Sequence, residues 1–87
     1  MLELNLILNN KSGLHARPAS LFTKEASKYS STITVVKDGK EYNAKSILHI
    51  LGMGAVKGTK LTIIAEGADE KAAIDSLKVL ADQDFGE

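Results

Sequence analysis

The sequence predicts an α+β fold of two layers, in which three helices cover one face of a four-stranded, mainly antiparallel sheet. Alternating apolar and polar residues indicate the strands, apolar residues spaced by three and four indicate the helices, and the resulting order is β-α-β-β-α-β-α. Two β-α-β units that bury their helices on the same sheet face form an open-faced sandwich, whose other face meets solvent. With 87 residues and no linker, residues 1–87 are expected to form one domain.

The N-terminal strand and the first helix are predicted from simple periodicities. Leucines occupy every second position of residues 2–8, which is typical of a strand with one buried face. Residues 9–13 follow as a loop, and a helix is expected over residues 16–28. Pro18 suits its first turn, and Ala19, Phe22 and Ala26 share one of its faces.

The middle of the chain predicts a hairpin and a short helix. Residues 32–37 are rich in β-branched side chains, and residues 40–43 can pair back onto them through an Asp38-Gly39 turn. Ser46 is expected to be the N-cap of a helix over residues 47–53, which the glycines at 52 and 54 end.

The C-terminal part predicts the last strand, over residues 60–66, and a last helix with Asp69 as its N-cap. Three apolar residues, Ile7, Val36 and Ile64, fall on the sheet face that is otherwise polar. The apolar stripe of the last helix comprises Ala73, Ile74, Leu77, Leu80 and Ala81.

The composition excludes several classes of protein. The chain has no cysteine, so it has neither disulfides nor thiolate metal sites, and two histidines 34 residues apart make no metal-ligand pattern. No apolar run is long enough to cross a bilayer, and the N-terminus lacks the features of a signal peptide. We therefore expect a cytoplasmic protein that does not insert into membranes and binds no metal or cofactor.

The charges are unevenly distributed although they sum to zero. Residues 1–60 contain nine Lys and Arg against four Asp and Glu, whereas residues 61–87 contain two against seven. A neutral chain is a poor nucleic-acid binder. The cations that fall near His15 favour an acidic protein partner, although they would equally suit a merely solvated surface. They are Lys11, Arg17, Lys24, Lys28 and Lys45.

A seven-residue motif, Gly13-Leu14-His15-Ala16-Arg17-Pro18-Ala19, contains the chain's single arginine and single proline. His15 stands where a helix begins, and the free N–H groups of Ala16 and Arg17 there favour an anion. The guanidinium of Arg17 suits phosphate oxygens, and Gly13 permits an unusual loop conformation. The motif therefore indicates a histidine that accepts a phosphoryl group. The alternative is a surface histidine that caps a helix beside an unrelated arginine.

Ser46 begins a helix that is apolar on nearly every side. A helix this short cannot bury all its faces on a sheet, so we expect Ile47, Leu48 and Leu51 to be partly exposed. An exposed apolar patch is typical of a protein interface. The alternative is that Ser46 serves as an N-cap and nothing more.

The seven-residue motif resembles the phosphohistidine signature of the HPr family, the phosphocarrier proteins of the bacterial phosphoenolpyruvate-dependent sugar phosphotransferase system, and the likeness extends over the whole chain. It implies a phosphoryl-group carrier and not an enzyme in the strict sense, and we expect this carrier to be a monomer. His15 would accept a phosphoryl group from phosphorylated enzyme I and pass it to enzyme IIA domains, with Arg17 as the phosphate partner. The residues implied to dock partners are Ser12, Ala16, Ser20, Lys24, Ile47, Leu48 and Leu51.

The resemblance also implies regulation at Ser46, by an HPr kinase/phosphorylase and through a catabolite-control transcription regulator. The chain departs from the family pattern here, with Leu48 and Leu51 for methionines, His49 for a glycine and Gly52 for a serine or threonine. Two alternatives remain: an HPr-like carrier of a nitrogen-related or dihydroxyacetone phosphorelay, and a module that only binds partners through Ser46. The pair of His15 and Arg17 favours a carrier.

Overall fold

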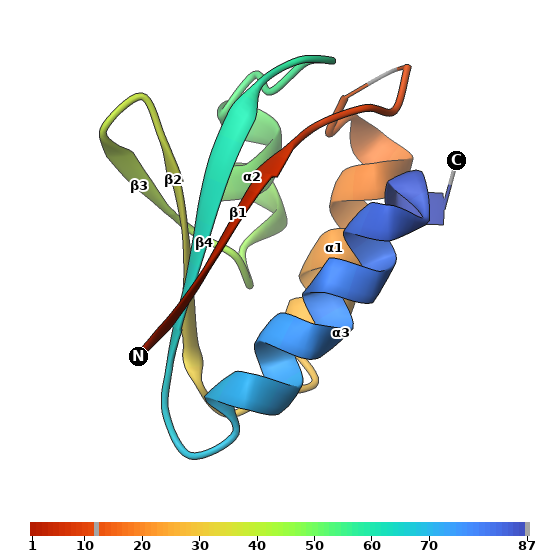
Figure 1. Cartoon of the computed structure of the whole chain (residues 1–87). Coiled ribbons are helices and arrows are strands. Elements are labelled where there is room, and N and C mark those ends of the chain that lie inside the picture. The colour runs from red at the N-terminus through yellow and green to blue at the C-terminus, as the bar shows by residue number, and fades with distance from the viewer. Residues whose placement is uncertain (12, 87) are drawn as a thin grey trace.

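The computed structural model describes residues 1–11 and 13–86. It consists of one four-stranded sheet, in the order β1-β4-β2-β3, with the helices packed on one side (Figure 1). This confirms the predicted open-faced sandwich. The elements are β1 (Leu2–Ile7), α1 (Ala16–Ala26), β2 (Thr32–Lys37), β3 (Lys40–Asn43), α2 (Ile47–Gly52), β4 (Lys60–Glu66) and α3 (Glu70–Asp82), followed by a short 3₁₀ helix, η1 (Asp84–Gly86).

Alternate side chains of each strand point toward the helices, and the side chains between them point to the open face of the sheet. Each of its three strand pairs is antiparallel, and Ile63 of β4 stands between Leu4 of β1 and Val35 of β2. On the open face, the Thr62 hydroxyl donates to the side-chain oxygen of Asn5 at 2.7 Å. The predicted buried face of β1 consists of alternate leucines. Of these, Leu2 is still 37% exposed, because it begins a strand at the edge of the sheet.

The hairpin between β2 and β3 has the predicted turn. Asp38 and Gly39 both have positive φ, at 52° and 78°, as the favoured two-residue hairpin turn requires.

Two helices end slightly earlier than predicted. α1 stops at Ala26. The Ser27 N–H still donates to the Thr23 carbonyl four residues back, but the Lys28 and Tyr29 amides donate only three residues back, so the helix closes in a tighter turn. α2 stops at Gly52, with Met53 as its C-cap, and the Lys37 ammonium donates to the Met53 carbonyl at 2.9 Å. A lysine from the sheet thus binds a helix end that carries partial negative charge.

Asp69 stands at the N-cap of α3, as predicted, but its side chain does not cap that helix. Its carboxylate accepts hydrogen bonds from the backbone N–H groups of Ser30 and Ser31, at 2.8 and 2.9 Å, and from both hydroxyls. These donors, the Ser31 hydroxyl first, lower the pKa of Asp69 to about 2. The start of α3 is thereby tied to the turn between α1 and β2.

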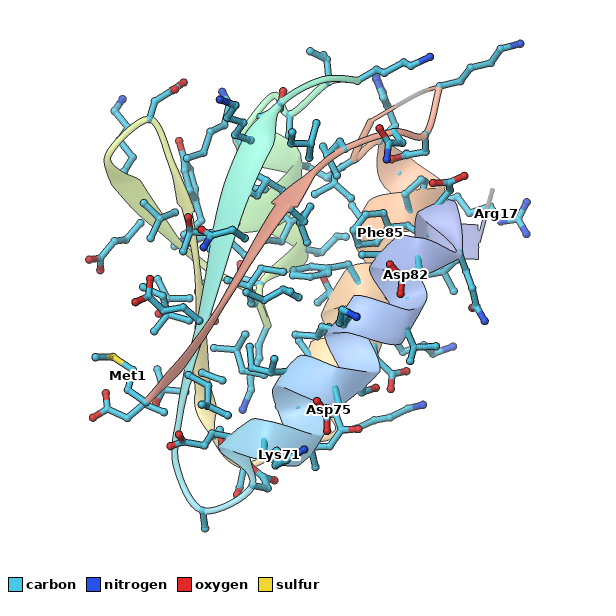
Figure 2. The ribbon with its side chains drawn as sticks, in the orientation of Figure 1. Met1, Arg17, Lys71, Asp75, Asp82 and Phe85 are labelled. Carbon is cyan, nitrogen blue, oxygen red and sulfur yellow. The ribbon has the colours of Figure 1, made fainter. Side chains whose placement is uncertain are left out.

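The C-terminal segment completes the core, which the sequence did not predict. Phe85, in η1, is buried, and its ring meets that of Phe22 edge-on at a centroid distance of 5.9 Å. Figure 2 shows Phe85 directed inward beside the end of α3. α1 therefore packs against the common core and against this segment, with the residues at its start carried at one end.

Candidate functional site

His15 is exposed and forms the N-cap of α1, as the motif predicted. Its backbone is extended, with φ −81° and ψ −167°, and its carbonyl accepts the first helical hydrogen bond from Ala19 at 2.8 Å. Its imidazole makes no capping hydrogen bond. Since Pro18 has no N–H, the first-turn amides without an intrahelical partner are those of Ala16 and Arg17. An exposed imidazole and two backbone amides without an intrahelical partner therefore stand together.

Arg17 is the second residue of α1, two positions after His15, and Figure 2 shows its side chain extended away from the body of the protein. Among residues 1–11 and 13–86, Arg17, Lys11 and Lys24 take part in no ion pair. Lys28 instead pairs with Glu25 at 2.9 Å, and Lys45 donates to the Tyr29 carbonyl at 2.7 Å. Two of the five predicted cations thus have structural roles, whereas Arg17 is available to bind an anion.

The loop before His15 is held by the connection between α2 and β4. Leu14 is buried, and its N–H donates to the Ala55 carbonyl at 3.0 Å. Gly13 has φ +62°, as the motif analysis anticipated, and the side-chain amide of Asn10 donates to its carbonyl. Ala55 was not singled out from the sequence. The sequence signal that could have pointed to this connection is its two glycines, Gly54 and Gly58. Both have positive φ, which is typical of a tight turn.

Ser46 is the N-cap of α2, as predicted, and its hydroxyl oxygen accepts a hydrogen bond from the His49 N–H at 3.3 Å. The predicted apolar patch is exposed: Ile47 by 37%, Leu48 by 78% and Leu51 by 41%. Ile50 faces the core instead. Nδ1 of His49 accepts from the Asn43 N–H at 3.0 Å, so this imidazole, unlike that of His15, is bound to the backbone.

The other predicted docking residues extend this surface along α1. Ala16, Ser20 and Lys24 are exposed, and α1 packs against α2, which brings the two groups of residues onto neighbouring helices. Ser12 lies outside the described residues. Within the described part of the chain, no three acidic, histidine or cysteine side chains cluster as a metal site would need, and no helix could cross a membrane.

The chain is similar to phosphocarrier proteins over nearly its whole length. A family model described as the PTS HPr component phosphorylation site matches residues 2–83. The phosphocarrier protein HPr of Mycoplasma capricolum is 46% identical over 78 residues, which cover 90% of this chain and 88% of that protein. The HPr-like protein Crh of Bacillus subtilis is 42% identical over 77 residues, covering 88% and 91%. A solved structure of it is described as the catabolite repression HPr.

The fold is also that of a solved HPr. The crystal structure of HPr from Thermoanaerobacter tengcongensis superposes with a TM-score of 0.96 at 49% identity, covering 100% of this chain and 98% of that one. Sequence, fold and the phosphorylation-site model agree, and the chain therefore belongs to the HPr family of phosphocarrier proteins of the phosphotransferase system.

Proposed function

We propose that the protein is a cytoplasmic, monomeric phosphocarrier in which His15 accepts a phosphoryl group from phosphorylated enzyme I and donates it to enzyme IIA domains. The observation that carries the proposal is the exposed His15 imidazole, which makes no capping bond at the start of α1. Imidazole is well populated in its neutral, nucleophilic form near pH 7. The phosphocarrier names of its relatives support the same role.

In the proposed transfer, a lone pair on an imidazole nitrogen of His15 attacks the phosphorus held on a histidine of enzyme I. A new N–P bond forms as the N–P bond of the donor breaks in line with it, and the donor imidazole leaves with the bonding pair. The amides of Ala16 and Arg17 and the guanidinium of Arg17 stabilise the phosphoryl oxygens. Transfer to an enzyme IIA domain repeats this displacement with His15 as the leaving group.

Docking would use the exposed residues of α1 and α2. Arg17 and Lys24 supply positive charge for an acidic partner, and Ile47, Leu48 and Leu51 supply apolar contact. A carrier has to leave each partner after transfer, so a small, transient interface suits it.

We further propose that Ser46 is a regulatory phosphorylation site, modified by an HPr kinase/phosphorylase. A phosphate there would stand at the N-terminus of α2, which tolerates negative charge, beside the exposed apolar patch. It would weaken docking to acidic enzyme I and create a surface for a catabolite-control transcription regulator. The Crh relative, described as a catabolite repression HPr, supports this second role.

The test is incubation of the purified protein with enzyme I, phosphoenolpyruvate and Mg²⁺, followed by intact mass and acid treatment. His15→Ala is the test variant, and His49→Ala is its matched control, since it removes the other imidazole. We expect an acid-labile phosphoryl adduct on the wild type and on His49→Ala, and none on His15→Ala. Native mass of the same samples reports whether the protein is a monomer.

A folded wild type that gains no adduct from active enzyme I would contradict the proposal. It would point to the donor of a nitrogen-related or dihydroxyacetone phosphorelay, or to a module that only binds partners.

A further inference from the structure

The connection between α2 and β4, residues 53–59, holds both ends of the loop before His15. At the first end, the Leu8 N–H donates to the Thr59 carbonyl at 3.0 Å, and the Gly58 N–H donates to the Leu8 carbonyl at 2.7 Å. At the second end, the Leu14 N–H donates to the Ala55 carbonyl at 3.0 Å. The position of the residue after Leu14, which is His15, is therefore set by a segment some 40 residues further along the chain.

At the second end, the backbone of Gly13 packs directly against the backbone of Ala55 and Val56. A Cβ atom on Gly13 would lie 2.3 Å from the Ala55 oxygen and 2.6 Å from the Val56 Cα. Leu14 and Ala55 are each 3% exposed, so water has little access to the hydrogen bond between them. A shift of Ala55 and Val56 would consequently be transmitted to Gly13 and Leu14.

The side chain that shapes this connection is that of Thr59. Its hydroxyl oxygen accepts a hydrogen bond from the Val56 N–H at 3.1 Å, and its own N–H donates to the Val56 carbonyl at 3.0 Å. These two bonds close the turn that carries Ala55 and Val56 toward the loop before His15.

We propose that Thr59 is a positioning residue for phosphoryl transfer at His15, acting through Val56, Ala55 and Leu14. The proposal rests on the proposed carrier function of His15. The His15 imidazole has no capping bond of its own, so its place beside the Ala16 and Arg17 amides depends on where the backbone holds it. In-line transfer between two histidines is sensitive to displacement of the nucleophile by a fraction of an ångström to an ångström.

The experiment compares three variants. Thr59→Val removes the hydroxyl at constant shape, and Thr59→Ser restores it. Thr62→Val is the control: it removes a hydroxyl from β4, three residues further on, whose hydrogen-bond partner Asn5 lies on the open sheet face. The rate of phosphorylation by phosphorylated enzyme I is measured over a range of enzyme I concentrations, together with hydrogen exchange of the Leu14 amide. We expect Thr59→Val to lower the maximal rate by roughly tenfold with KM unchanged, and to speed Leu14 exchange. Thr59→Ser and Thr62→Val should resemble the wild type.

Equal rates and equal Leu14 exchange in Thr59→Val and Thr62→Val would overturn the proposal, as would a Thr59→Ser variant as slow as Thr59→Val. Faster Leu14 exchange with an unchanged rate would also overturn it, because the hydroxyl would then be structural alone. Failure of the wild type to accept phosphate would overturn the proposed function, and Leu14 exchange would still decide whether Thr59 holds the loop.

Discussion

The two helix starts that carry the proposed phosphorylation sites use their capping side chains in opposite ways. At α1, the His15 imidazole makes no capping bond, and Arg17, two residues later, forms no ion pair with the residues that the structure describes. At α2, the Ser46 hydroxyl accepts a bond from the His49 amide at 3.3 Å, and apolar residues follow. α1 has 11 residues and is packed by the sheet and by Phe85, whereas α2 has six and leaves part of its apolar surface exposed.

This difference indicates which of the two side chains can be phosphorylated without the loss of a hydrogen bond that stabilises its helix. A side chain with no structural bond can gain and lose a phosphoryl group in every cycle at little cost to the helix. Ser46 is part of the helix that it starts, so a modification there acts on a docking surface. The following predictions test this contrast, from the largest expected effect to the smallest.

Replacing Arg17 should have the largest effect, because it removes a charged donor from the transferring phosphoryl group. We expect Arg17→Ala to lower the maximal rate of His15 phosphorylation by about 10²-fold. Arg17→Lys should fall in between, because it keeps the charge but loses the planar fork. Lys24→Ala is the control and should raise KM alone. A maximal rate unchanged in Arg17→Ala would assign the arginine to docking instead of transfer.

A negative charge at Ser46 should impair transfer from enzyme I, since it places an anion beside the apolar patch that faces an acidic partner. We expect Ser46→Asp to slow His15 phosphorylation on the order of tenfold at limiting enzyme I. Ser46→Asn is the matched control, because it caps a helix equally well without charge. If the two variants react at the same rate, charge at this position does not regulate docking.

Stability should distinguish the two caps directly. Ser46→Ala deletes the hydrogen bond to the His49 amide and should lower the free energy of unfolding by about 1 kcal/mol. His15→Ala deletes no capping bond and should change it by less than about 0.5 kcal/mol. Urea unfolding of both variants and the wild type measures the two values. A larger loss in His15→Ala than in Ser46→Ala would contradict the contrast drawn here.

The third helix start provides a pH-dependent test. Hydrogen bonds from the hydroxyl and backbone N–H groups of Ser31 and Ser30, the Ser31 hydroxyl first, lower the pKa of Asp69 from 3.8 to about 2. The Asp69 carboxylate therefore binds a proton less readily in the folded state than in the unfolded state. The stability that the carboxylate contributes is present in full above pH 3.8 and is lost as the pH falls through about 2. Asp69→Asn should therefore be less stable than the wild type at pH 7, and the difference should narrow below pH 4.

Asp75→Asn, which removes an exposed carboxylate paired with Lys71 on the same helix, is the control for that measurement. Between pH 2 and pH 7, the unfolding midpoint of this control should change with pH in nearly the same way as that of the wild type. A constant difference between wild type and Asp69→Asn across that range would show that the ionised carboxylate is not what ties α3 to the turn before β2.

Much of the fold and the position of both sites could be predicted from the sequence, since both depend on local patterns. The alternation in β1 and β4, the Asp38-Gly39 turn and the helix starts at His15 and Ser46 involve residues within a few positions of one another. The predicted helix ends were less accurate. α1 is shorter than predicted because the Lys28 and Tyr29 amides bond three residues back instead of four, a choice that periodicity does not encode.

The sequence by itself determined which residues lie on a buried face and which chemical groups begin each helix. The tertiary structure decided which distant groups meet. It joined Asp69 to Ser30 and Ser31, paired Phe85 with Phe22, and placed Ala55 and Thr59 behind the loop before His15. The physical reason is that hydrophobic periodicity specifies a face but not its partner, whereas a hydrogen bond or a packed ring depends on two chain segments arriving at the same place.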